Sequence, residues 1–267
     1  MPFADTTAGK LHYEVTGSGP PILLLHSLFC DSTMWRHQVA ELGGDHRLIL
    51  LDGPSHGESA VPWEALTIEQ CARAAVDVLD HLELQSAVFC GISWGGMTAM
   101  RAALDAPARV RALLLFGTSA DAQRWSARII NYALLLLVSR LNLLSPIAPV
   151  LAAALLGETT RRRRPELARE LVAGIRKLDP DGLAHVIRTV LVERLAMIEE
   201  LWRVECPTLV VSGSEDTAVA PIQCERIARR IPGARFQMVA EAGHLAPLEA
   251  PEPVNALTRA FLDERGL

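Results

Sequence analysis

The sequence of 267 residues lacks several features that would place a protein in a class at first sight. It has only five cysteines, their number is odd and no two form a Cys-x-x-Cys pair, so neither a disulfide framework nor a zinc knuckle is predicted. Basic residues do not dominate, because 26 Lys and Arg stand against 31 Asp and Glu, a net charge of −5. This balance argues against nucleic-acid binding through overall charge.

Long apolar runs and a targeting segment are also missing. The N-terminal residues MPFADTTAGKLHYEV have no basic start followed by an apolar run, so no signal peptide is expected. The longest apolar stretches, at residues 133–138 and 147–156, are too short to span a bilayer. We therefore expect a cytoplasmic protein with neither a membrane nor a nucleic acid as its partner.

What is present is the composition of a globular protein, with 50% hydrophobic and 21% charged residues. Short apolar runs predict strands, and helical patterns follow most of them. The predicted strands are residues 10–15, 22–26, 48–51, 87–92, 110–116, 208–212 and 235–239. The predicted helices are residues 67–82, 94–105, 222–231 and 254–264, the first with Thr67 as N-cap. This alternation predicts an α/β fold with a mostly parallel, doubly wound sheet.

The alternation stops in the middle of the chain. Residues 119–201 have helical patterning with Pro and Gly breaks and no convincing strand. We therefore expect a core domain in two parts, residues 1–118 and 204–267, and a helical cap inserted at residues 119–203.

The strongest local signal is the sequence Gly-Ile-Ser-Trp-Gly at residues 91–95, between a predicted strand and a predicted helix. In that context the pattern predicts a nucleophile elbow, which exposes the hydroxyl of Ser93 at the end of the sheet. A serine hydroxyl needs a base to become a nucleophile. His244, in Glu-Ala-Gly-His-Leu after the last predicted strand, is the best candidate.

The base in turn needs a carboxylate that orients its ring. Asp216 follows the predicted strand at residues 208–212, and it is preferred over the adjacent Glu215, with Asp121 as the fallback. Ser93, Asp216 and His244 then stand in the chain order of α/β-hydrolases, each after a predicted strand. The oxyanion requires two N–H donors, which we assign to the backbone of Leu28 and Trp94, with Phe29 as an alternative to Leu28.

The chain resembles the α/β-hydrolase superfamily along nearly its whole length. The matching pieces are HSLF, DGPSHGES, GISWGG, PTLVVSGSED and EAGHLAPLEAPEPVNALTRAFL, in the order of the family. Within the superfamily, the HSL sequence before Met34-Trp35 and the GGM sequence after Ser93 are similar to 3-oxoadipate enol-lactonases and related carboxylesterases. The resemblance implies an α/β-hydrolase fold and structural roles for His26 and His56 beneath the oxyanion hole.

Two positions depart from the usual pattern of the family. Ser27 stands where many relatives have Gly, although enol-lactonase-like members share the serine. Ser55 stands in DGPSHG where relatives usually have Gly, and it is expected to strain or reshape that turn.

The predicted cap is expected to form one wall of an apolar pocket. Trp125, Tyr132 and Trp202 are candidates for its lining. The four arginines at residues 161–164 are interpreted as a solvated loop or helix start rather than as a binding site for an anion. An enol-lactone substrate would also need a cation in the pocket. The candidates for that cation are Arg124, Arg128, Arg140 and Arg188.

Taken together, the sequence predicts a serine hydrolase that needs no cofactor and no metal. Its expected substrate is a small, largely apolar carboxylic ester or lactone, which forms an acyl-enzyme on Ser93. The alternatives that use the same triad are C–C bond hydrolysis, peracid formation and acyl transfer, and a further alternative is a ligand receptor without catalysis. Assembly into a homo-oligomer is compatible with the sequence.

Overall fold

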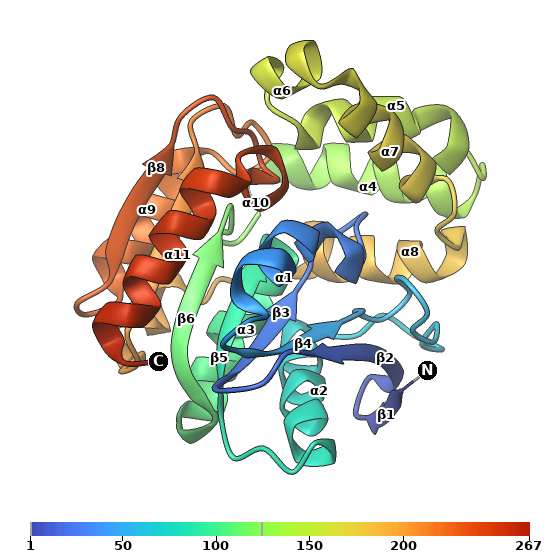
Figure 1. The fold of residues 1–267 in the computed structure, drawn as a ribbon. Helices are drawn as coiled ribbons and strands as arrows, with labels where there is room; N and C mark the ends of the chain where they lie inside the picture. Colours follow the sequence, from blue (N-terminus) through green and yellow to red (C-terminus); the bar gives the residue numbers. More distant parts are fainter. Residues whose placement is uncertain (1, 124) are drawn as a thin grey trace.

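The structure is a computed structural model that describes residues 2–123 and 125–267. An eight-stranded sheet in the order β1-β2-β4-β3-β5-β6-β7-β8 forms its centre (Figure 1). The strands are β1 (Phe3–Thr6), β2 (Gly9–Thr16), β3 (Pro21–Leu25), β4 (Arg47–Leu51), β5 (Ala87–Ile92), β6 (Val110–Phe116), β7 (Thr208–Gly213) and β8 (Arg235–Val239). From β4 to β8 along the sheet all neighbours are parallel, whereas β1 pairs with β2 and β2 with β4 in antiparallel fashion. The predicted mostly parallel sheet is confirmed.

The position of each strand in the sheet follows from its sequence. The central strands β3 (PILLL) and β5 (AVFCGI) are buried almost throughout, as expected where helices cover both faces of a parallel sheet. The edge strand β8 (RFQMV) is mostly exposed. The antiparallel strand β1 was not predicted, because its short sequence FADT lacks an apolar run.

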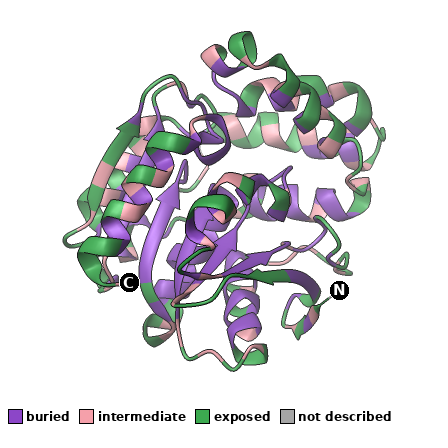
Figure 2. Ribbon diagram, viewed as in Figure 1, coloured by how far each residue is buried: buried purple, intermediate pink, exposed green. Residues whose placement is uncertain are grey.

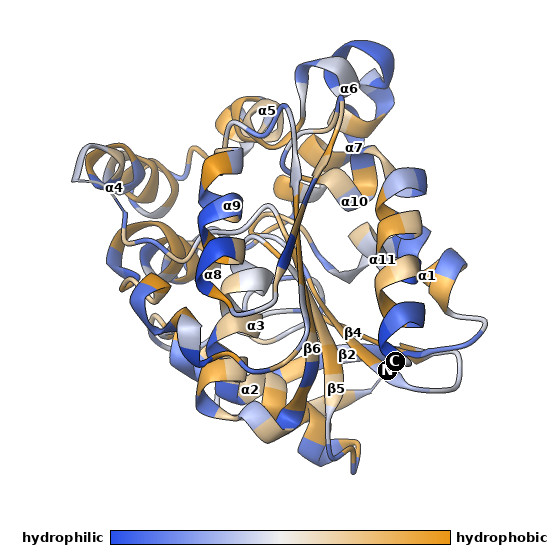
Figure 3. Cartoon of the chain, turned by 90° about the vertical axis from the view of Figure 1, so that its left-hand side faces the viewer, coloured by the Kyte–Doolittle hydropathy of each residue, from blue (hydrophilic) through white to orange (hydrophobic). Residues whose placement is uncertain are grey.

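Helices cover both faces of the sheet. Figure 3 shows α2 (Ile68–His81), α3 (Trp94–Asp105) and α9 (Pro221–Arg230) on one side, and α1 (Arg36–Leu42) and α11 (Pro251–Arg265) on the other. Helix α2 begins at its predicted N-cap, because the Thr67 hydroxyl accepts the Gln70 N–H and the Gln70 side chain accepts the Thr67 N–H. Shorter elements are the 3-10 turns η1 (Ser32–Trp35) and η2 (Pro107–Arg109), and the helix α10 (Ala246–Glu249).

Between β6 and β7 the chain leaves the sheet and forms a group of helices. They are α4 (Trp125–Ser139), α5 (Leu144–Leu155), α6 (Glu158–Arg163), α7 (Pro165–Ile175) and α8 (Pro180–Ile187), followed by the π-helical turn η3 (Arg188–Glu193) and the 3-10 turn η4 (Ile198–Arg203). Figure 1 shows α4 to α8 on the side of the sheet where β6 ends. The described part of this stretch contains no strand, as its helical patterning predicted.

The residues of this helical group are less buried than those of the sheet. Figure 2 shows buried residues along the sheet and many exposed residues on α4 to α7. Helix α4 keeps much of its apolar side exposed, including Trp125, Ile129 and Ile130, and it is the orange helix at the left of Figure 3. No helix among the described residues combines the length and the apolar character needed to cross a membrane.

Candidate active site

Ser93 lies in the turn between β5 and α3, in a backbone conformation that residues other than glycine rarely adopt. Its φ is +53° and its ψ is −115°. Such a residue stores strain, which persists only where the surroundings fix the backbone. Here the Ser93 carbonyl accepts the Thr118 hydroxyl at 2.7 Å and the Met97 N–H at 3.0 Å. Ser93 therefore has the strained strand-to-helix turn that a nucleophile elbow requires, although the residue is buried rather than exposed.

The glycines of the elbow are required by close backbone contacts. A Cβ on Gly91 would stand 2.3 Å from the Gly95 carbonyl oxygen, and a Cβ on Gly95 would stand 2.1 Å from the Leu25 carbonyl oxygen. Both distances are too short for a side chain. Because these positions lack side chains, β5 can approach α3 at Gly91, and β3 can approach α3 at Gly95.

His244 and Asp216 form a buried hydrogen-bonded pair. His244 Nδ1 lies 2.9 Å from Asp216 Oδ2, and the exposed fractions of the two side chains are 2% and 0%. Asp216 Oδ1 accepts the N–H groups of Ala218 and Val219 at 2.9 and 2.8 Å. Because a carboxylate only accepts hydrogen bonds, Nδ1 must carry the proton, and Nε2 is left as the basic nitrogen.

The end of β6 and the residue after it lie against both Ser93 and the pair of His244 and Asp216. The Ser93 N–H donates to the Phe116 carbonyl at 2.9 Å. A Cβ on the next residue, Gly117, would stand 3.1 Å from Asp216 Oδ2 and 3.2 Å from His244 Nδ1. The three residues predicted from the sequence therefore lie at the same edge of the sheet, around the end of β6.

The two alternatives to Asp216 face other partners. Glu215 accepts the N–H and the hydroxyl of Thr159 at 2.8 and 2.6 Å, at the start of α6. Asp121 pairs with Arg226 at 2.9 Å. Neither carboxylate has a hydrogen bond with His244, so the geometry favours Asp216 as the acid.

The N–H groups assigned to the oxyanion have no partner inside the protein. Among the described residues, neither the Leu28 N–H nor the Trp94 N–H donates a hydrogen bond. The Phe29 N–H, in contrast, donates to His56 Nε2 at 3.3 Å. The geometry therefore favours Leu28 over Phe29. Trp94 is the first residue of α3, where the helix dipole adds positive potential.

His26 and His56 hold the loops around Leu28 through hydrogen bonds of both ring nitrogens. His26 Nε2 accepts the Gly53 N–H at 2.8 Å, and its Nδ1 lies 2.8 Å from the Ser27 carbonyl. His56 Nε2 accepts the Phe29 N–H, and its Nδ1 lies 2.9 Å from the Pro54 carbonyl. Burial, together with the nearby His26, lowers the pKa of His56 to about 3. These contacts are those of loop-stabilising residues.

Asp52 is a residue near the site that sequence reasoning missed. Its carboxylate accepts the Ser32 N–H at 2.8 Å and the Glu58 N–H at 3.2 Å, and it lies 2.8 Å from His12 Nδ1. Burial alone would raise the pKa of Asp52, but the nearby His26 and the hydrogen bonds from Ser32 and His12 hold it below its usual range. Asp52 thereby joins the oxyanion loop to the loop after β4.

The unusual Ser55 has a strained backbone. Its φ is +64°, in the left-handed region that favours glycine, and its hydroxyl is buried without a hydrogen-bond partner. The expectation of strain at this departure from the family pattern is therefore met by the geometry.

Two cavities lie near the predicted oxyanion loop, one inside the core and one between the core and the helical group. A small one of about 30 Å³ is bounded by His26, Gly53 and Trp94, and a cleft of about 550 Å³ runs between α7 and the η1–α1 segment. Neither is lined by Ser93 or His244. The suggested lining residues Trp125, Tyr132 and Trp202 are more than half exposed. The described residues contain no cluster of three metal-ligating side chains.

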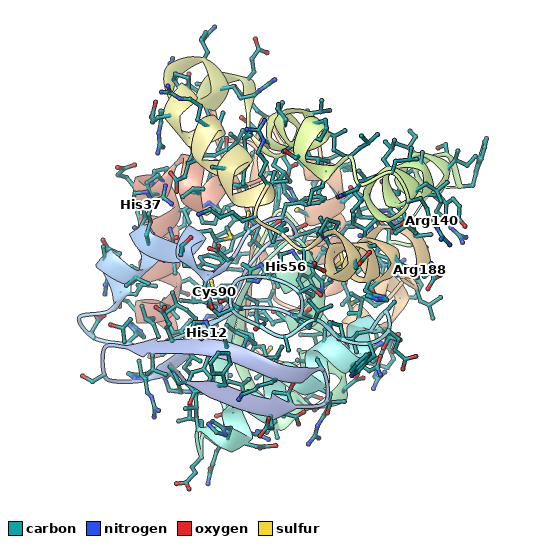
Figure 4. The ribbon with its side chains drawn as sticks, turned by 90° about the vertical axis from the view of Figure 1, so that its right-hand side faces the viewer. His12, His37, His56, Cys90, Arg140 and Arg188 are labelled. Carbon is teal, nitrogen blue, oxygen red and sulfur yellow. The ribbon has the colours of Figure 1, made fainter. Side chains whose placement is uncertain are left out.

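The cations suggested from the sequence do not converge on the site. Arg128 and Arg140 are exposed, Arg188 pairs with Glu193, and Arg124 lies outside the described residues. Figure 4 shows Arg140 and Arg188 at the outside of the helical group, whereas His56 lies in the interior.

Arg194 is a further arginine of the helical group, and it was not among the candidates taken from the sequence. It donates to the Asp121 carbonyl at 3.1 Å and to Met97 Sδ at 3.4 Å, one helical turn after Ser93. Burial lowers the pKa of Arg194 to about 10, and no carboxylate forms a hydrogen bond with its guanidinium among the described residues.

Comparison with known proteins gives a consistent result. Residues 20–251 match the model of the α/β hydrolase fold family. The chain is 28% identical to the 3-oxoadipate enol-lactonase 2 of Acinetobacter baylyi, over 97% of each chain. It is 27% identical to a carboxylesterase of Bacillus subtilis, over 97% of this chain and 86% of that one. A solved thermophilic esterase from Thermogutta terrifontis superimposes with a TM-score of 0.92, at 32% identity over 99% and 98% of the two chains.

Proposed function

Because the chain belongs to the α/β hydrolase fold family, we propose that it is a serine hydrolase acting on the ester bond of a small, largely apolar carboxylic ester or lactone. The observation that carries this proposal is the buried pair of His244 and Asp216, which leaves the basic Nε2 of His244 at the sheet edge where Ser93 is held in its strained turn. The relatives named as an enol-lactonase, a carboxylesterase and an esterase support ester or lactone chemistry.

In the first half-reaction, His244 Nε2 takes the proton of the Ser93 hydroxyl while Ser93 Oγ attacks the carbonyl carbon. The Leu28 and Trp94 N–H groups bind the negative charge that develops on the carbonyl oxygen. Asp216 holds the imidazole tautomer and stabilises the imidazolium. The leaving alkoxide takes the proton from His244, and Ser93 carries the acyl group.

In the second half-reaction, His244 takes a proton from water, and the water oxygen attacks the acyl carbon. The tetrahedral intermediate again places its negative oxygen at the same N–H groups. When it collapses, Ser93 recovers its proton from His244, and the acid is released. Residues 119–203 act as a cap over this edge of the sheet, because their helices lie on the side where β6 ends.

Arg194 favours substrates that carry a carboxylate as well as the ester bond. Burial destabilises this guanidinium, the nearby charge of Asp121 offsets that only in part, and no carboxylate among the described residues forms a hydrogen bond with it, so it gains from an anionic ligand. An Arg194→Met variant is expected to lower kcat/KM for the glutarate monoester of para-nitrophenol about 10- to 100-fold, the value of one hydrogen bond to a charged group. The neutral para-nitrophenyl pentanoate serves as the matched control, and an equal loss on both esters would contradict this role.

The proposed activity is tested by intact-mass spectrometry after treatment with a fluorophosphonate. We expect one adduct on the wild type and none on Ser93→Ala or His244→Ala, with all three proteins folded by circular dichroism. A panel of esters, lactones and dienones then distinguishes ester hydrolysis from C–C bond hydrolysis. A folded wild type that neither reacts with the probe nor turns over any substrate would refute the proposal and favour a receptor.

A further inference from the structure

The loop that carries His244 touches the helical group between β6 and β7, not only the core. The His244 N–H donates to the carbonyl of Leu155, the last residue of α5, at 3.2 Å. A Cβ on Gly157 would stand 2.8 Å from the Gly243 nitrogen, and a Cβ on Gly243 would stand 2.1 Å from the Gly157 nitrogen. The two backbones are therefore in direct contact, and only glycine fits at either position.

A buried carboxylate joins the same two segments. Glu249 Oε1 accepts the N–H of Leu245, the residue after His244, at 2.9 Å. Glu249 Oε2 accepts the Gly157 N–H at 2.8 Å. The exposed fraction of Glu249 is 7%, and burial raises its pKa against the opposing effect of these hydrogen bonds. Burying a carboxylate is costly unless its oxygens are bonded, so this arrangement fixes both segments together.

Further side chains connect the helical group with the loops that carry Asp216 and His244. Glu215, next to Asp216, accepts the Thr159 N–H and hydroxyl. Arg163 pairs with Glu241, and Arg164 donates to the Glu249 carbonyl at 3.0 Å. Part of the arginine run, interpreted from the sequence as solvated, thus contacts the loop of the catalytic base.

We propose that Glu249 is a positioning residue for His244, through which residues 155–164 of the helical insertion form a structural part of the acid–base pair. This inference rests on the proposed serine hydrolase function. The core alone leaves the His244 backbone N–H without its acceptor, because Leu155 belongs to the insertion, and it leaves Glu249 Oε2 without the Gly157 N–H. Loss of the Glu249 carboxylate therefore displaces the base from its position, while the nucleophile turn keeps its own contacts.

The matched control is a contact between the insertion and the core that does not involve His244. Glu170 on α7 pairs with Arg36 on α1 at 2.8 Å, and both side chains are largely exposed. Glu249→Gln and Glu170→Gln each replace one carboxylate by an amide of the same size. The Glu249 carboxylate contacts the loop that carries His244, whereas the Glu170 carboxylate contacts Arg36 instead.

The test measures the rate constant of fluorophosphonate labelling, and kcat and KM for one ester, at a temperature where circular dichroism shows each variant folded. For Glu249→Gln we expect labelling and kcat to fall about 10- to 100-fold, as for a small displacement of a catalytic group, with KM within about threefold. Glu170→Gln is expected to label and turn over like the wild type. Glu215→Gln, a milder change, is expected to slow labelling less than Glu249→Gln and provides a second variant if that protein does not fold.

The downfield proton signal of His244 Nδ1–H gives an independent readout. It is expected to be lost in Asp216→Asn, shifted in Glu249→Gln and unchanged in Glu170→Gln. Labelling of Glu249→Gln at the wild-type rate, or equal losses in Glu249→Gln and Glu170→Gln, would overturn this inference. A wild type that does not react with the probe at all would instead refute the proposed hydrolase function.

Discussion

The two halves of the candidate site are held in different ways. The nucleophile half, which comprises Ser93, Leu28 and Trp94, is surrounded by core elements: the end of β6 and the loops stabilised by His26 and His56. The acid–base half, Asp216 and His244, is contacted by the core and also by the inserted residues 155–164. The first half is held mainly by contacts within the core, with Arg194 of the insertion donating to Met97 one turn after Ser93. The second half is in direct backbone contact with residues 155–164, which lie outside the sheet.

This difference matters for catalysis, because the two halves must meet within a narrow range of distances. A core mutation near Ser93 therefore changes stability first, since the strained turn is part of the folded core. A change in the insertion is expected to alter the position of the base without unfolding the protein. Variants in either half test this contrast.

The largest effect is expected from Asp216→Asn, which changes the acid–base half alone. The N–H groups of Ala218 and Val219 bond one side-chain oxygen, so the amide oxygen of Asn stays there and its NH₂ group faces His244. The imidazole must then accept at Nδ1 and carry its proton on Nε2, the wrong tautomer. We expect kcat to fall by about 10⁴-fold with an unchanged fold, measured by ester turnover and circular dichroism. A loss below tenfold would show that Asp216 does not set the tautomer.

Gly157→Ala perturbs the contact between the insertion and the acid–base half. Its Cβ would stand 2.7 Å from Glu215 Oε2 and 2.8 Å from the Gly243 nitrogen, so the segments must separate. We expect kcat to fall about 100-fold, and the free energy of unfolding to fall by about 1–3 kcal/mol. Gly174→Ala in α7 is the control, because its Cβ meets no atom within 4 Å. Equal activity of the two variants would contradict the contrast between the halves.

Acid is expected to weaken the nucleophile half through His56. Burial, with the nearby His26, lowers the pKa of His56 from 6.5 to about 3, so below pH 6.5 the unfolded chain binds a proton that the folded protein does not. The stabilisation by neutral His56 is therefore lost as pH falls, by about 1.4 kcal/mol per pH unit between about pH 6 and 4. Denaturant unfolding of the wild type and His56→Gln over this range measures the slope, and parallel curves would contradict the prediction.

The smallest effect is expected at Ser55, beside the oxyanion loop. Its φ of +64° and its unbonded buried hydroxyl both cost free energy, and glycine relieves both. Ser55→Gly is expected to raise the free energy of unfolding by up to about 1 kcal/mol, with kcat unchanged. Thermal and denaturant unfolding measure the change, with Ser55→Ala as control, since it removes the hydroxyl but keeps the strain. A less stable Ser55→Gly would show that the serine makes a compensating contact.

The sequence predicted most of the core from local patterns. The central strands are continuous apolar runs, and the capping pair of Thr67 and Gln70 marks the start of α2, so their positions follow from short stretches of chain. The antiparallel strand β1 and the short helices α1 and α10 were not predicted, because none of them has a distinct periodic pattern. The candidate triad followed from motifs placed after strands, a local signal repeated at separated points of the chain.

Local patterns of a few neighbouring residues predicted the sheet, the turn at Ser93 and the candidates Asp216 and His244. The tertiary structure favours Leu28 over Phe29 and Asp216 over Glu215, and it adds Arg194 to the arginines considered. It also revealed the contacts of Glu249 and residues 155–164 with the base. Those decisions depend on which groups distant in sequence satisfy one another's hydrogen bonds when buried, and no local pattern carries that information.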